Sequence, residues 1–140
     1  MLQRLAFAGP KDAFSELGFG PGANLVYGAS NTGKSLALKA IDFMLGSTRV
    51  LPDITERHKY DRVLLTLQLP ASGQITLFRS IQGGPFTIVD GMADSIPDGV
   101  NRTLSAKHDP KNSENLSNLL LTELGLAGKQ HRCVRHEARR

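Results

Sequence analysis

Cysteine and tryptophan are almost missing from this sequence of 140 residues. Cys133 is the only cysteine, and tryptophan is absent. One cysteine excludes an intrachain disulfide and fits a reducing, cytoplasmic setting. The four histidines do not take a metal-ligand spacing with Cys133, so we do not expect a zinc site.

Long apolar runs and a charged body are also lacking. No stretch approaches the roughly 18 apolar residues of a membrane helix, and the run after Met1 is too short for a signal-peptide core. The net charge of +4 comes entirely from residues 129–140, because residues 1–128 hold 12 basic and 12 acidic side chains. A neutral body does not by itself indicate a nucleic-acid surface. Because no stretch is long and apolar enough for a membrane helix, we expect no membrane partner.

The first half of the chain predicts strands around one helix. Residues 2–8 suit a strand that Gly9-Pro10 ends, and residues 14–22 suit a weak strand and a turn. Residues 24–27 form a short apolar run typical of a buried strand. Apolar residues at helical spacing follow over 35–45, and Gly46 comes next, which predicts a left-handed helix end.

The second half predicts an antiparallel meander and a second helix. Alternating apolar residues over 63–69, 75–81 and 86–89 are separated by glycine-containing turns. Residues 91–111 are polar and suit a long loop. Ser113 is the expected N-cap of a leucine-rich helix that Gly125 ends.

Between the apolar run and the first helix lies a complete phosphate-binding motif, G-x-x-x-x-G-K-[ST]. Its residues are Gly28, Ala29, Ser30, Asn31, Thr32, Gly33, Lys34 and Ser35. Backbone N–H groups must converge on phosphate oxygens, and glycines permit the conformations that this requires. The start of the following helix adds positive potential at the phosphates.

Each fixed position of the motif has an expected role. We expect Lys34 to reach the β- and γ-phosphates and the Ser35 hydroxyl to ligate Mg²⁺. Asn31 stands where related loops often carry glycine, and asparagine tolerates positive φ better than most residues. The sequence therefore predicts binding of ATP with Mg²⁺, in a lobe over residues 1–128 followed by a disordered basic tail, 129–140.

The motif and its surroundings resemble the N-terminal lobe of SMC-, RecN- and SbcC-like ATPases, which are ABC-type heads with an AAA-type ATP-binding domain. The similar stretches are residues 24–35, 40–46, 78–81 and 116–126. This resemblance implies an α/β fold, with a partial P-loop NTPase core and an antiparallel meander subdomain. It also implies DNA repair or chromosome maintenance, with a second head or C-terminal half as a partner and DNA contacted through the complete assembly.

The catalytic parts of such heads are not visible in the sequence. We find no apolar strand ending in Asp-Glu and no serine-glycine-glycine signature loop, so the catalytic residues are unknown and we do not expect this chain alone to hydrolyse ATP. Three alternatives stay open: a truncated, inactive remnant, a nucleotide-gated association module, or another small P-loop NTPase or kinase. Asp90 and Asp94 are the fallback candidates for a catalytic carboxylate.

Basic residues outside the motif have ordinary interpretations. We expect Arg79, on a strand, to be a structural or surface residue rather than a ligand contact. Arg49, Arg57, Lys59 and Arg62 follow the first helix, with acidic residues among them, and are typical of a solvated face.

Overall fold

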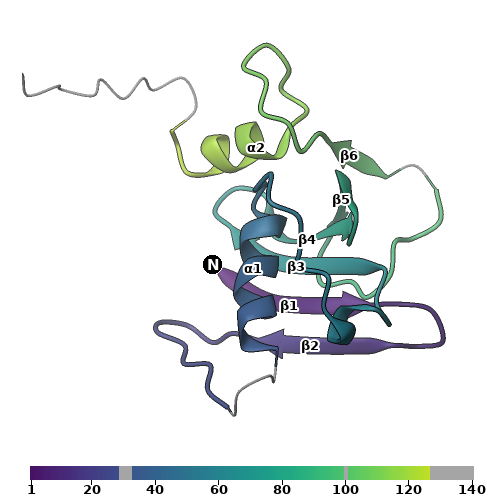
Figure 1. Ribbon diagram of the computed structural model, residues 1–140. Helices are drawn as coiled ribbons and strands as arrows, with labels where there is room; N and C mark the ends of the chain where they lie inside the picture. The colour runs from purple at the N-terminus through teal and green to yellow at the C-terminus, as the bar shows by residue number, and fades with distance from the viewer. Residues whose placement is uncertain (29–32, 100, 127–140) are drawn as a thin grey trace, which may run out of the picture.

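One six-stranded sheet with two short helices dominates the computed structural model, which describes residues 1–28, 33–99 and 101–126 (Figure 1). The elements are β1 (Leu2–Ala8), β2 (Phe14–Gly18), α1 (Lys34–Met44), a 3₁₀ turn (Thr55–Arg57), β3 (Arg62–Leu69), β4 (Gly73–Ser80), β5 (Gly83–Asp90), β6 (Arg102–Leu104) and α2 (Leu116–Glu123). The strand order is β2-β1-β3-β4-β5-β6, and each neighbouring pair is antiparallel.

The predicted fold class, an α/β P-loop NTPase core, is wrong for this structure. Such a core is built from parallel strands joined by helical crossovers. Here the strands are antiparallel throughout, and the two helices are only 11 and 8 residues long. The predicted meander of β3, β4 and β5 is present, but it is the middle of a single sheet rather than a separate subdomain.

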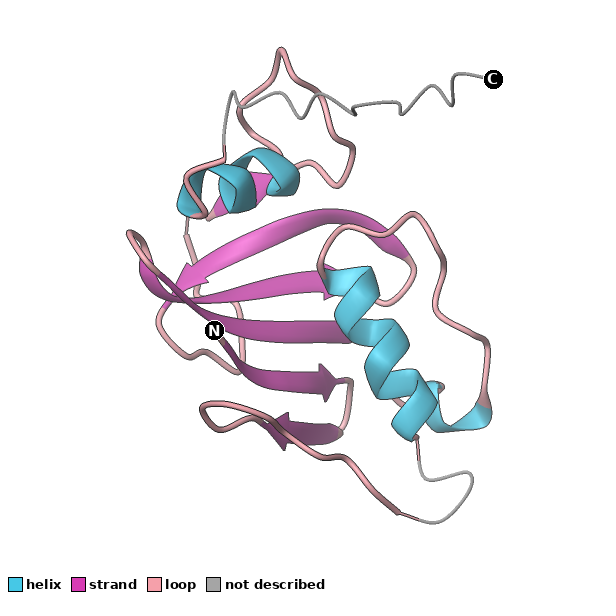
Figure 2. Ribbon diagram, turned by 90° about the vertical axis from the view of Figure 1, so that its left-hand side faces the viewer, coloured by secondary structure: helices cyan, strands magenta, loops and turns pink. Residues whose placement is uncertain are grey.

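The buried strand expected at residues 24–27 is also wrong. Leu25 and Tyr27 are 84% and 85% exposed, and the segment is a loop beyond the edge strand β2 (Figure 2). Asn24 explains the conformation, because its amide closes a tight loop. Its side chain accepts from the N–H of Gly20 at 2.9 Å and donates to the carbonyls of Gly20 and Gly22 at 3.0 and 3.1 Å. Asparagine commonly stabilises turns in this way.

Both faces of the sheet are covered, which is why β3 is apolar on consecutive residues rather than only on alternate ones. On one face α1 lies across the strands (Figures 1 and 2), and its residues Leu36, Ala40, Phe43 and Met44 join the main core. On the other face, Ala93 and Ile96 of the segment after β5 pack over a smaller cluster. That cluster consists of Ala6, Ala8, Leu64 and Phe78.

Most local predictions in the first half are confirmed. β1 ends at Ala8, and Gly9 is required there, since a Cβ would lie 2.1 Å from the carbonyl oxygen of Lys59. The first helix occupies Lys34–Met44, and Gly46 after it has φ 100, the predicted left-handed conformation.

In the second half, one strand and one cap differ from the predictions. The predicted loop at 91–111 contains the short strand β6. The second helix is present and Gly125 follows it with φ 69, but Asn115 rather than Ser113 is the N-cap. The Asn115 side chain accepts from the N–H of Asn118 at 2.8 Å. The proposed basic tail, 129–140, lies outside the described residues.

Glu123 fastens the end of α2 to the β3–β4 turn. Its carboxylate accepts from the Ser72 hydroxyl and from the backbone N–H groups of Ala71 and Ser72, the latter two at 2.9 and 3.4 Å. The hydrogen bond from the Ser72 hydroxyl, followed by that from Ala71, holds the pKa of Glu123 below its ordinary value. The anion is therefore favoured in the folded state.

This lowered pKa predicts an acid-sensitive contact. Because the folded pKa lies below the unfolded one, the contribution to stability is present above the unfolded pKa and is lost as pH falls through the folded value. The melting temperature of Glu123→Gln should therefore fall less than that of the wild type between about pH 6 and pH 3. Glu114→Gln, on an exposed loop, is the control. Parallel curves of melting temperature against pH for wild type and Glu123→Gln would contradict the role assigned to the Glu123 carboxylate.

Candidate nucleotide-binding site

The motif surrounds the start of α1. Gly33 is the helix N-cap and has φ 83, a left-handed conformation that residues with a side chain rarely adopt. The first helical hydrogen bond runs from the N–H of Ala37 to the carbonyl of Gly33 at 3.0 Å. Ala29, Ser30, Asn31 and Thr32, which were predicted to contact phosphate, lie outside the described residues.

The electrostatics of this helix end favour an anion. The backbone N–H groups of a first helical turn have no acceptor within the helix, and they carry the positive end of the helix dipole. The first turn of α1 contains no acidic residue, and no side chain caps it. A phosphate oxygen placed here would accept from these N–H groups without a competing carboxylate from the same turn.

Lys34 joins the two ends of the motif. Its ammonium donates to the carbonyl oxygen of Gly28 at 2.7 Å, and its side chain is half-buried. The contact holds the cation beside the loop entrance rather than extended into solvent. Ser35, the next residue, is exposed at the first turn of the helix.

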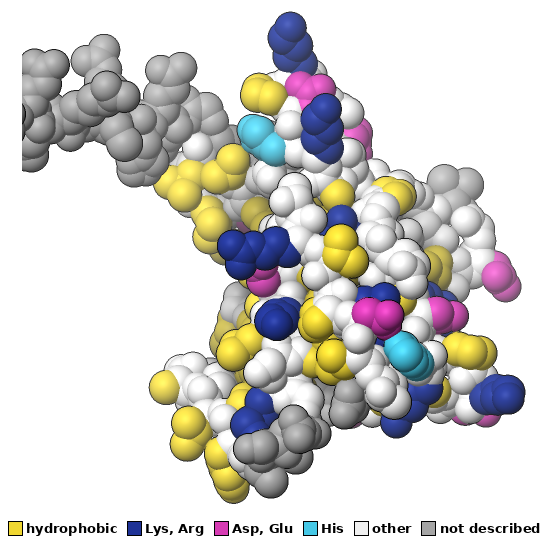
Figure 3. Space-filling view, viewed as in Figure 1, with side chains coloured by type: hydrophobic (Ala, Val, Ile, Leu, Met, Phe, Trp, Pro, Cys, Tyr) yellow, Lys and Arg dark blue, Asp and Glu magenta, His cyan; other side chains and the backbone are white. Residues whose placement is uncertain are grey.

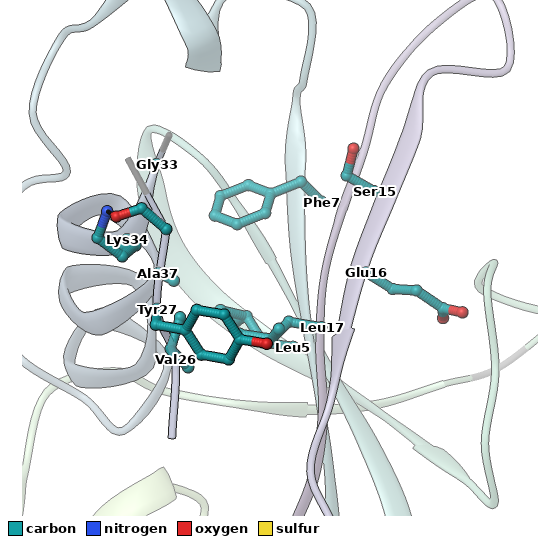
Figure 4. Close-up of a pocket in the computed structure, with 11 residues that line it drawn as sticks. Leu5, Phe7, Ser15, Glu16, Leu17, Val26, Tyr27, Gly33, Lys34 and Ala37 are labelled. Atoms are coloured by element: carbon teal, nitrogen blue, oxygen red, sulfur yellow. Dashed lines mark hydrogen bonds between the residues drawn. The ribbon is translucent and has the colours of Figure 1, made fainter. Parts of the chain in front are cut away.

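A cavity of about 430 Å³ opens beside these residues (Figure 4). Its volume lies within the range usual for small-molecule sites. One wall consists of Gly28, Gly33, Lys34 and Ala37, and β1 and β2 form the opposite wall. The remaining lining residues are Leu5, Phe7, Ser15, Glu16, Leu17, Val26 and Tyr27.

The polar groups of the strand wall already have partners. The Ser15 hydroxyl lies 2.6 Å from the hydroxyl of Tyr60, and the Glu16 carboxylate accepts from Arg4 at 3.3 Å. In Figure 4 the Glu16 side chain points away from the side chains of Leu5, Phe7 and Leu17. The cavity is therefore apolar on the strand side and cationic at the helix side.

Mg²⁺ would need oxygen ligands from the nucleotide in addition to those that the protein supplies at this site. Mg²⁺ takes six oxygen ligands and usually keeps several waters together with phosphate oxygens. Ser35 is exposed beside Lys34, so its hydroxyl is accessible as one such ligand. Over the described part of the chain, no group of three or more histidine, cysteine, aspartate or glutamate side chains is arranged to hold a metal.

The structure does not bring the fallback carboxylates to this site. Asp94 binds Arg4 at 2.5 Å on the sheet face opposite α1. Asp90, at the end of β5, lines a different cavity with Ile75 and Ile88. The strand order separates Asp90 from the site, since β3 and β4 lie between β1 and β5, whereas Asp94 is separated from it by the sheet itself.

Two basic residues turn out to be internal. Arg57, interpreted from the sequence as part of a solvated face, is only 8% exposed and donates to the carbonyls of Leu51 and Pro52 at 2.5 and 3.3 Å. That interpretation was wrong. Arg79 is also 8% exposed and has a structural role, in agreement with the preferred interpretation.

The sequence did not reveal the residues of the strand wall. Phe7 and Leu17 face Lys34 only because α1 crosses the sheet, and neither lies in a local motif. Residues 2–8 were predicted only as a strand, and residues 14–22 only as a weak strand and a turn. Neither prediction distinguishes a cavity wall from a packed interior.

A scan against protein-family models finds no match, and a search of curated protein sequences also finds none. Among the residues that the structure describes, no helix is long and apolar enough to cross a membrane.

Proposed function

We propose that this chain binds ATP with Mg²⁺ through the loop from Gly28 to Ser35. The observation that carries the proposal is the position of Lys34 and Gly33, at the start of a helix and on the wall of a cavity. Lys34 contacts the β- and γ-phosphates, and Ser35 supplies one oxygen to the metal. Bound Mg²⁺ neutralises phosphate charge.

The direct test is a calorimetric titration of the purified chain with ATP in the presence of Mg²⁺. We expect saturable binding with one site per chain. Competition by tripolyphosphate should follow, because the loop recognises phosphate oxygens. Absence of both heat and competition against a fluorescent ATP analogue would refute the proposal.

The assigned role of Ser35 gives a separate prediction. Ser35→Ala should weaken binding of ATP with Mg²⁺ more than binding of ATP in EDTA, since its hydroxyl serves the metal. Ser47→Ala, beyond the far end of α1, is a matched control whose hydroxyl accepts from the N–H of Arg49. An equal loss for Ser35→Ala with and without the metal would count against metal ligation.

The wider role remains a proposal from resemblance. Similarity to SMC- and RecN-like heads supports a place in an ATPase assembly for DNA repair or chromosome maintenance, with a second head or C-terminal half as the partner. The charge of residues 1–128 does not favour direct DNA binding by this part alone. DNA would then be reached through the complete assembly.

A second candidate, a nucleotide-gated association module, is favoured by the surface. Apolar side chains gather on the loop before α1 and on α2, with Lys and Arg side chains between them (Figure 3). Leu25, Leu38 and Leu124 are 84%, 71% and 66% exposed. Exposed apolar patches of this kind often mark interaction sites. Sedimentation with and without ATP tests this candidate, because an association module changes mass with nucleotide.

A further inference from the structure

We propose that the cavity between α1 and the paired strands β1 and β2 holds the base of the bound nucleotide, with the ring of Tyr27 stacked on it. The ligand class is then nucleoside triphosphates, with adenine and guanine accepted alike, rather than inorganic polyphosphates. This inference rests on the proposed function and extends it from the phosphates to the nucleoside.

Continuity with the phosphate site is the first argument. Gly28, Gly33 and Lys34 line the same cavity as the apolar residues of the strands. A triphosphate held at the start of α1 therefore has its nucleoside end beside this space, and the volume of about 430 Å³ is of the size usual for small-ligand sites.

The chemistry of the walls is the second argument. Phe7, Leu17 and Ala37 line the cavity with apolar side chains, which suit the flat faces of a base rather than the charged phosphates of the nucleotide. Tyr27 stands at the mouth with 85% of its surface exposed (Figure 4). An aromatic ring stacks on any base, because every base has a π-face.

The third argument concerns the edge of the base. Ser15 and Glu16 are polar lining residues on the strand wall, and they are bound to Tyr60 and Arg4 respectively. Strong discrimination between similar ligands needs polar groups directed at the differing atoms, and an apolar pocket supplies much less. We therefore expect ATP and GTP to bind within about tenfold of each other.

The experiment compares ATP, GTP and tripolyphosphate, each with Mg²⁺, on the full chain. Wild type should bind ATP and GTP more tightly than tripolyphosphate. Tyr27→Ala should lower the affinity for ATP by about tenfold, since the loss of one base-stacking contact typically has an effect of this size. The affinity for tripolyphosphate should not change. Leu25→Ala is the matched control, because Leu25 is 84% exposed on the same loop and does not line the cavity.

A second variant tests the space rather than the ring. Ala37→Leu fills the cavity from α1 with a good helix former, and it should weaken ATP binding while tripolyphosphate stays within about twofold of wild type. If ATP and tripolyphosphate respond equally to both variants, or if wild type binds them equally, base binding is refuted while the phosphate site stands. If wild type binds neither, the proposed function fails and this inference fails with it.

Discussion

Replacing Lys34 with alanine is expected to lower ATP affinity by about tenfold or more, which corresponds to about 1.4 kcal/mol or above. The ammonium of Lys34 is the motif's side-chain cation, and the structure places it at the cavity beside Gly28. A charge-assisted hydrogen bond to phosphate is stronger than a neutral one, so a hydrogen bond from water does not make up for its loss. The measurement is a calorimetric or fluorescence titration with ATP and Mg²⁺.

Lys39→Ala is the matched control for this experiment. Lys39 lies on the same helix, is exposed, and borders a different cavity with Leu38 and Asp42. Its removal changes the net charge by the same amount, and we expect ATP affinity to stay within about twofold of wild type. Equal affinities in wild type and Lys34→Ala would refute the assigned contact. Equal losses in Lys34→Ala and Lys39→Ala would show that general electrostatics rather than a specific contact governs binding.

The helices and central strands could be predicted because their signals are local. Ala37, Ala40 and Met44 recur at helical spacing, and Gly46 supplies the left-handed end. The turns at Gly73 and Gly83 have φ 73 and 103, so the glycines that separated the predicted strands are required by the backbone.

The sheet order and the loop before α1 could not be predicted in the same way. β1 pairs with both β2 and β3, and the second pairing joins residues about 60 positions apart, so no local pattern specifies it. Leu25 and Val26 have the composition of a buried strand. The amide of Asn24 closes a loop instead, and the neighbouring parallel strand that a P-loop core requires is not among the strands described.

The residues of the candidate site also fall into two groups, those that a local motif identifies and those that only the fold brings together. Lys34 and Ser35 were identified because the motif's chemistry is contiguous in sequence. Phe7 and Leu17 line the cavity opposite α1, an arrangement that depends on contacts between distant segments. The internal roles of Arg57 and Arg79 depend on carbonyl acceptors in other segments, and charge patterns in the sequence do not reveal these.

Arg79 is the residue whose loss should destabilise the fold most. Its guanidinium lies between two rings, 4.1 Å from the centroid of Phe43 and 4.6 Å from that of Phe86. It donates to the carbonyl of Phe43 at 2.8 Å and to that of Gly84 at 2.9 Å. Burial lowers the pKa of Arg79, so the cation depends on these partners for its stability in the interior.

These contacts join α1 to the sheet. Phe43 lies in the last turn of α1, where carbonyl oxygens carry the negative end of the helix dipole and favour a cation. Gly84 is in β5, so one side chain of β4 connects the helix to the next strand. The guanidinium is suited to this, since its planar donors and faces act at the same time.

Arg79→Ala is therefore expected to lower the free energy of unfolding by about 3 kcal/mol or more, through lost packing and unpaired buried carbonyls. Arg79→Met should recover part of the loss, because it restores apolar volume between the rings but cannot donate to either carbonyl. Arg102 is an exposed strand arginine whose Nε lies 3.7 Å from the Glu114 carboxylate. As a control, Arg102→Ala should change the free energy of unfolding by less than about 1 kcal/mol. Urea denaturation measures all three. A loss for Arg79→Ala no larger than that for Arg102→Ala would show that α1 is held to the sheet by apolar packing alone.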